Sequence, residues 1–485
     1  MNSSELLFAF VILSDILFSG IIFGWGSLLL ILSEERQYTT LCSDFLDADK
    51  VCQAQEIQLN LIFALATAAM NAVALPTGLL LDRFRPTMLI TCAAAMEISG
   101  LFLFAFADSE TFDVFVPAYV FLAIGGCMTM MTSFPASVVA KHHRAAALAA
   151  ISCSFDASSA VFLLGYAIHE NFGVTRQKLF LFHAILGIFI YGSLIILWRM
   201  NEDKVYKKLP SSKVLVTGNK TSVEGLMDES VYSRLSNEDT KRLTERSYPQ
   251  YGSVNKQAVM ICQSENQNRE SCAGEKDRVL NSDLLDMTMK DQLCTFEFVY
   301  VLTLASLQIL RTTLFIGTAN KLLENYGDAK QGNLYTKAFG FVLPLGFVFV
   351  PLIDCIVKRE GLVYALTFTN TLGLLYNLLS FAPILPLQIV TFLLFAAYRA
   401  FLYAIVSTFV IRTFGLSNLG SMMGIIFSIG SIASFLEYPA LAISNSYLGG
   451  DLTVVNGFSL LIAIPLYPLT QLYKRRSQPC LLEED

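Results

Sequence analysis

Six ionisable side chains interrupt long apolar stretches of this 485-residue sequence. At the depth of a lipid bilayer a charged group costs several kcal/mol, unless it faces a cavity or a partner. Such groups can bind a polar solute, carry a proton or pair with one another, so each is a candidate for function. For one of them, Glu97, packing or pairing is the expected role. The six are Asp15, Glu97, Asp156, Arg311, Arg399 and Glu437.

The richest pattern surrounds Arg399. In the helix predicted over residues 384–411, one narrow face carries polar and aromatic side chains at helical spacing: Gln388, Phe392, Phe395, Arg399 and Tyr403. A planar ligand could stack on the rings and hydrogen-bond to Gln388 and Arg399, or Arg399 could clamp a carboxylate. The alternative is a structural ion pair between Arg399 and a carboxylate on another helix.

Other predicted helices carry smaller polar sets. Asp156 shares a helix face with two serines, where it could accept hydrogen bonds from a substrate or pair with a basic group. Asn71 belongs to a polar stripe, although asparagines also hold membrane helices together. Arg311 lies close to Asn320 in sequence, but the two face opposite sides of an unbroken helix. A break at Gly317 would let both reach one site.

The composition explains why these groups stand out. The chain is 54% hydrophobic and only 15% charged, with a mean hydropathy of +0.54. Soluble domains carry about 25% charged residues, so the sequence predicts an all-α integral membrane protein whose main partner is the lipid bilayer. The modest net charge of −6 argues against nucleic-acid binding.

A bilayer core of about 30 Å needs about 20 apolar residues per helix. This rule predicts twelve spans, six on each side of a polar tract, with the first too long for a signal peptide. We expect a six-helix bundle over 1–198, a mostly disordered loop over 199–291, a second six-helix bundle over 292–473 and a tail over 474–485. The predicted spans are 6–32, 58–81, 87–107, 113–138, 145–168, 178–198, 293–318, 332–354, 361–381, 384–411, 419–443 and 452–473.

Basic residues predict the orientation. They gather at alternate helix junctions, which places both termini and the central loop in the cytoplasm, and we expect the plasma membrane to be the location. One such junction reads PTGLLLDRFRPT, where Gly78 lets helices approach closely and Asp82, Arg83 and Arg85 can bond to neighbouring helix ends. A corresponding junction in the second half carries Asp354, Lys358 and Arg359. We expect both junctions to form a cytosolic gate.

The six-plus-six layout and the G-x-L-x-D-R junction resemble the major facilitator superfamily. More specific segments resemble solute carrier family 43: FGWGSLLLIL (23–32), PTGLLLDRF (76–84), SFDASSAVFLL (154–164), LFIGTANKLL (314–323) and YRAFLYA (398–404). This resemblance implies facilitative transport, either of purine nucleobases such as adenine, guanine and hypoxanthine or of large neutral amino acids such as leucine, phenylalanine and methionine. Asp15 and Glu437 depart from the family pattern, where a glutamate and a glutamine are expected.

The leading hypothesis is therefore facilitative transport of a small polar solute, most of all a purine nucleobase, by alternating access. Large neutral amino acids are the alternative substrates, and a non-transporting membrane receptor is the alternative from another class. Cys42 and Cys52 lie in one polar loop and are expected to form a disulfide. The sequence shows no catalytic triad, P-loop, metal-binding or haem motif, so we expect no enzyme activity, metal or cofactor. One chain is expected to suffice for function.

Overall fold

The computed structural model describes residues 3–42, 53–140, 143–206, 284, 287–332, 334–436, 440, 444 and 452–477. Helices dominate this part of the chain, and its only β-type pairing is an isolated bridge between Asp108 and Phe112. We call residues 3–206 the first half and residues 287–477 the second half. Most of the predicted disordered loop lies outside the described residues, but the last helix of the first half continues to Tyr206, beyond the predicted end at 198.

The helices of the first half follow the predicted spans closely. They are α1 (Ser3–Ser14), the π-helix η1 (Asp15–Ser19), η2 (Ile21–Gly24), α2 (Trp25–Glu34), η3 (Thr39–Leu41), α3 (Gln53–Arg83), α4 (Pro86–Phe106), α5 (Phe115–Ser133), η4 (Phe134–Val139), α6 (Arg144–Ala157), α7 (Ala160–Phe172) and α8 (Arg176–Tyr206). Pro86 begins α4, where its missing N–H costs nothing.

The second half repeats the arrangement. Its helices are α14 (Met289–Leu293), α15 (Phe296–Asn325), η5 (Asp328–Gln331), α16 (Leu334–Val342), η6 (Leu343–Phe349), α17 (Val350–Arg359), α18 (Leu362–Ser380), α19 (Leu385–Phe414), α20 (Leu419–Ser434), α22 (Thr453–Ala463) and α23 (Leu466–Ser477). Gly415, with a φ of 80°, ends α19 in a conformation that other residues rarely adopt.

Ten of the described helical segments are long and apolar enough to cross a membrane. An eleventh arises if Ser3–Ser19 and Ile21–Glu34, which meet at a 43° bend, form one span. The remaining predicted span, 419–443, begins with α20, and most of its residues beyond 436 lie outside the described part.

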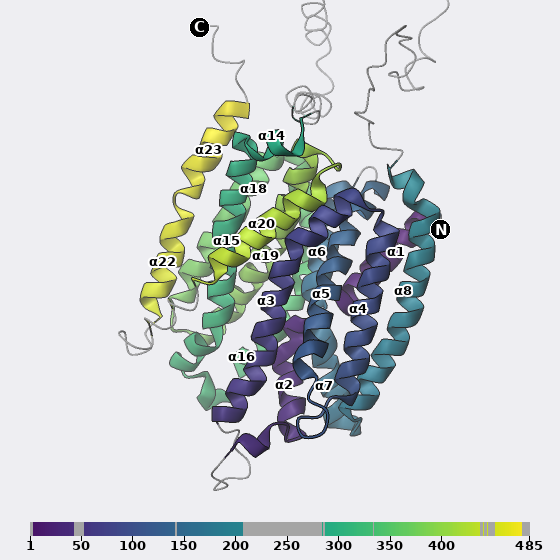
Figure 1. The fold of residues 1–485 in the computed structure, drawn as a ribbon. Coiled ribbons are helices and arrows are strands. Elements are labelled where there is room, and N and C mark those ends of the chain that lie inside the picture. The colour runs from purple at the N-terminus through teal and green to yellow at the C-terminus, as the bar shows by residue number, and fades with distance from the viewer. Residues whose placement is uncertain are drawn as a thin grey trace, which may run out of the picture. The chain divides into compact units, whose positions relative to one another are not determined.

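The two halves lie side by side (Figure 1), and they meet where α3 packs on α20 and where α6 packs on α19, η6 and α17. The start of α1 lies beside the end of α8, where the Asn201 amide donates to the Ser3 hydroxyl at 2.7 Å. The start of α15 lies beside the end of α23, where the Tyr300 and Tyr473 rings stack at 4.7 Å. We call this end of the helices, where the described chain begins and ends, the terminal side.

A buried arginine fixes the opposite side of the first half. Arg176, at the start of α8, donates to the Glu35 carboxylate at 2.6 Å, to the Ala107 carbonyl at 2.8 Å and to the Phe104 carbonyl. Its guanidinium also lies over the Phe115 ring, 5.2 Å from the centroid. The side chain thus occupies the last carbonyls of α4 and ties that helix to α2 and α8.

Arg176→Ala is expected to lower the melting temperature of the purified full chain by several degrees. The substitution leaves Glu35 and two helix-end carbonyls without their donor, and breaking a buried ion pair costs about 3 kcal/mol or more. The matched control is Lys178→Ala, because Lys178 is exposed on the same helical turn. Equal melting temperatures for the two variants would contradict the assigned role.

Candidate functional site

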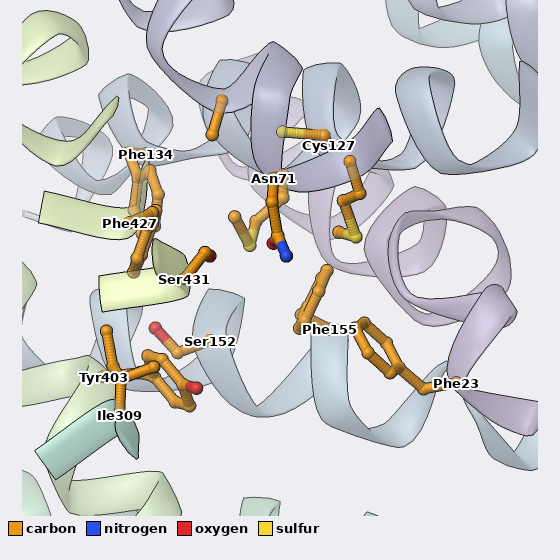
Figure 2. A pocket seen from close by; sticks show the side chains of 13 residues that line it. Phe23, Asn71, Cys127, Phe134, Ser152, Phe155, Ile309, Tyr403, Phe427 and Ser431 are labelled. Carbon is orange, nitrogen blue, oxygen red and sulfur yellow. The ribbon is translucent and has the colours of Figure 1, made fainter. Parts of the chain in front are cut away.

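A cavity of about 120 Å³ lies between the two halves (Figure 2). The first half contributes η2, α3, α5, η4 and α6 to its wall, and the second half contributes α15, α19 and α20. The lining residues are Phe23, Met70, Asn71, Ala74, Cys127, Met130, Phe134, Ser152, Phe155, Ile309, Tyr403, Phe427 and Ser431. Both halves therefore face one central space, as an alternating-access site requires.

Aromatic rings and a few neutral polar groups form this wall. Figure 2 shows the Asn71 side chain projecting into the space, with the rings of Phe23 and Phe155 on one side and those of Phe134 and Phe427 on the other. Further polar groups come from Ser152, Tyr403 and Ser431. The Ser152 hydroxyl has no hydrogen-bond partner among the described residues, so it is free to bind a ligand.

An ion pair between the halves lies next to the cavity wall. Arg399 on α19 donates to the Asp156 carboxylate on α6 at 2.5 Å, and only 12% and 5% of the two side chains are exposed. Asp156 lies one helical turn after Ser152. The Arg399 guanidinium lies 5.8 Å from the centre of the Tyr403 ring. The pairing that the sequence left open for Arg399 is therefore present, and it contacts a cavity residue.

The rest of the predicted stripe on α19 does not reach the cavity. Gln388 donates to the Ala382 carbonyl at 2.7 Å, in the turn before α19. Phe392 packs against Phe339 with centroids 4.9 Å apart, inside the second half. Gln388 and Phe392 do not line this cavity, because the stripe is more than four helical turns long and only Tyr403 at its end belongs to the cavity wall.

Arg311 and Asn320 also lie apart from the cavity. Arg311 is fully buried in the second half, where it donates to the Gln308 side chain and to the Gly373 carbonyl, each at 2.7 Å. The rings of Tyr376 and Tyr398 lie 6.0 and 5.6 Å away. Asn320 is exposed.

The expectation that α15 breaks is wrong. The helix continues through Gly317 to Asn325, so Asn320 cannot turn toward the groups around Arg311.

The predicted gate at Gly78 and Asp82 joins the two halves on the terminal side. The Asp82 carboxylate accepts from the backbone N–H groups of Gly420 at 2.9 Å and Ser421 at 2.7 Å, at the start of α20. A carboxylate at this position is stabilised by the free N–H groups and the dipole of the helix. A Cβ on Gly78 would overlap the Gly420 carbonyl, so only glycine allows this approach.

The two arginines of this junction were expected to bond to neighbouring helix ends, as Asp82 does, but the structure places them elsewhere. Arg83 and Arg85 are exposed, and Arg85 approaches Glu202 of its own half at 3.8 Å. The contact across the gate is therefore made by the carboxylate alone, because the start of a helix offers N–H donors and no acceptor for arginine.

The corresponding junction of the second half makes a matching contact. Asp354, near the end of α17, accepts from Lys358 at 2.7 Å, and its carboxylate lies 2.8 Å from Nδ1 of His143. His143 immediately precedes α6. In each junction a carboxylate near the end of one half's second span meets the start of the other half's fifth span. The sequence identifies the two acidic residues but not His143. The correspondence between the two halves is the signal that could have predicted His143 as the partner of Asp354. Arg359 is exposed.

Two halves around a central cavity, with a matching contact between them in each junction, form the arrangement expected for transport by alternating access. The sequence profile of the Major Facilitator Superfamily matches residues 7–438. The chain belongs to this superfamily. The fold and the multi-pass membrane character predicted from the sequence are thereby confirmed. Members of this superfamily are membrane transporters and not enzymes.

Relatives within the superfamily fall into both of the expected branches. Equilibrative nucleobase transporter 1 of Bos taurus is 25% identical, over 92% of this chain and 91% of its own length. Large neutral amino acids transporter small subunit 3 of Homo sapiens is 23% identical, over 93% and 90%. Among solved structures, a double-tryptophan mutant of XylE superposes with a TM-score of 0.56 at 15% identity, covering 98% and 96% of the two chains, which supports the fold.

The remaining predicted residues stand as follows. Asp15 is fully buried in η1, away from the cavity wall, and accepts from the Ser133 hydroxyl at 2.9 Å. Glu437 and Cys52 lie outside the described residues. Cys42 is disulfide-bonded, which leaves its pairing with Cys52 a prediction. Within the described ranges, no three His, Cys, Asp or Glu side chains converge on a possible metal site.

Proposed function

We propose that this superfamily member moves purine-type nucleobases across the membrane by alternating access, driven by the gradient of the solute. The observation that carries the proposal is the lining of the cavity, which contains aromatic rings, an amide and hydroxyls but no charged side chain among the described residues. A planar, neutral base can stack on the rings and hydrogen-bond to Asn71, Ser152 and Tyr403. Residues from both halves of one chain line the cavity, which supports a monomer as the functional unit.

Large neutral amino acids are the second candidate, and the Asp156–Arg399 pair is the observation in their favour. An amino acid carries both an ammonium and a carboxylate, which need partners of opposite charge when they leave water. Asp156 and Arg399 could supply these partners only by separating, since they now neutralise each other at 2.5 Å. The nucleobase is favoured because it requires no such separation.

The basic junctions support an orientation with the terminal side in the cytoplasm, and we propose the plasma membrane as the location. The contacts at Asp82 and Asp354 then close the cytoplasmic side, which is the state in which a solute enters from outside. Fluorescent or epitope tags at both ends should accordingly be accessible only after permeabilisation of the cells.

Uptake of labelled adenine and labelled leucine by the same expressing cells, each challenged by the other, tests the function. Saturable adenine uptake that excess leucine leaves unchanged is the expected result. Uptake of leucine alone would support the second candidate. A ligand-dependent signal without flux of either solute would indicate a receptor instead.

Asn71→Ala is expected to raise the KM for adenine about three- to tenfold, because a lost hydrogen bond costs about 0.5–1.5 kcal/mol. Asn60→Ala is the matched control, since Asn60 is exposed on the same helix and outside the cavity. An unchanged KM in Asn71→Ala would show that Asn71 does not contact the solute.

A further inference from the structure

Two carboxylates are buried inside the first half with no cation beside them among the residues that the structure describes. Asp15 and Glu97 are both 0% exposed. One oxygen of Asp15 accepts from Ser133, whereas its other oxygen and both oxygens of Glu97 have no hydrogen-bond partner in the described part of the chain. An ionised carboxylate in such surroundings lacks both water and a counter-charge, so binding a proton is the inexpensive way to occupy this position.

Both carboxylates face the same group of helices. Glu97 on α4 fills the space opposite Gly125 on α5, where an added Cβ would lie 2.7 Å from the Glu97 Cγ. The Tyr191 hydroxyl on α8 lies within electrostatic reach of both Glu97 and Asp15. It also hydrogen-bonds to Thr129 of α5 at 2.8 Å. Tyr191 therefore lies near both carboxylates and is tied to α5 through Thr129.

The charged neighbours are all engaged elsewhere. Arg176 is bound to Glu35 and to the end of α4, two turns beyond Glu97, and Arg85 approaches Glu202 at the terminal side. His183 hydrogen-bonds to the Leu17 carbonyl at 3.0 Å. The titratable side chains that α5, α6 and α8 bring to this depth are Tyr119, Cys127, Cys153, Asp156, His183 and Tyr191. None of them is a cation positioned to neutralise Asp15 or Glu97.

Asp15 is connected to the cavity wall through short segments. Asp15 begins the π-helix before Gly20, at the 43° bend of the first span, and Phe23 beyond that bend lines the cavity. Its partner Ser133 directly precedes Phe134, another lining residue. A change of charge at Asp15 thus acts on two parts of the wall.

We propose that Asp15 and Glu97 form a proton-binding site, through which this transporter moves protons together with its solute. The inference rests on the proposed transport function and extends it. In each transport cycle the pair takes up one proton from the side to which the cavity is open and releases it after the halves have changed state. At equal pH on both sides and zero membrane potential the protein behaves as a simple facilitator, and under a pH gradient it accumulates solute.

Infrared spectroscopy of the full chain in lipid bilayers tests proton occupancy without any solute. A protonated-carboxyl band is expected at neutral pH, and Asp15→Asn and Glu97→Gln should each remove part of it. Asp203→Asn is the control, because Asp203 is exposed near the end of α8 and lies outside the buried pair. A band that neither substitution changes would overturn the proposal.

Transport into proteoliposomes tests the coupling, with the membrane potential clamped by potassium and valinomycin. With the interior one pH unit more alkaline, coupling of one proton per adenine is expected to give about tenfold accumulation. Glu97→Gln should bring the accumulation ratio to one while adenine counterflow at equal pH continues. Asp203→Asn should accumulate adenine as the wild type does.

Accumulation that is absent in the wild type, although counterflow proceeds, would overturn the coupling. Absence of counterflow for both adenine and leucine would instead refute the proposed transport function. The infrared measurement would then still decide whether the proton site exists, so the two failures are distinguishable.

Discussion

Arg399→Ala is expected to reduce solute uptake about 100-fold or more at equal surface expression. The substitution leaves Asp156 buried between the halves without its partner, and an unpaired buried charge costs about 3–5 kcal/mol. It also removes the guanidinium that lies over the Tyr403 ring at the cavity wall. Initial uptake rates, normalised to surface protein, measure the effect. Unchanged kinetics would show that Arg399 serves neither the site nor the contact between the halves.

A double substitution separates the two roles of this ion pair. Asp156→Ala combined with Arg399→Ala is expected to recover much of the thermal stability lost in Arg399→Ala, because no unpaired charge remains. Uptake should stay low, since the Tyr403 ring still lacks its cationic neighbour. Full recovery of uptake in the double variant would assign Arg399 a purely structural role.

Gly78→Ala is expected to reduce uptake about tenfold or more, although alanine normally stabilises a helix by about 1 kcal/mol relative to glycine. The new Cβ overlaps the Gly420 carbonyl, so α3 and α20 must separate and Asp82 loses its contact with the start of α20. The population of the state closed on the terminal side then falls, and the transport cycle is impeded.

The gate can be followed directly with a cysteine. In a Ser421→Cys background, Gly78→Ala should increase reaction with a membrane-impermeant thiol reagent applied from the terminal side. Gly26→Ala is the matched control, because a Cβ at Gly26, also within a helix of the first half, meets no atom within 4 Å. Wild-type uptake and labelling in Gly78→Ala would refute the gate.

The sequence was most informative where a property depends on a few consecutive residues. Apolar length and helix-ending residues predicted most helices, and the local pattern of Gly78 and Asp82 predicted a contact between helix ends. The sequence was less informative about which helix a side chain inside a span contacts. Phe392 and Arg399 belong to one helix face, yet one packs inside the second half and the other pairs with the first half. Helical periodicity shows that two side chains point in the same direction from their own helix, but it does not show which other helix lies in that direction.

Taken alone, the amino-acid sequence determined the membrane class, most of the spans and the two acidic junctions, because hydropathy and junction motifs are local properties. Only the tertiary structure decided that Asp156 pairs with Arg399, that His143 joins Asp354, and that Asp15 and Glu97 have no cation beside them in the described part of the chain. These outcomes depend on contacts between segments far apart in the chain. The physical reason is that the cost of a buried charge depends on which helix lies opposite it, and that is settled by packing.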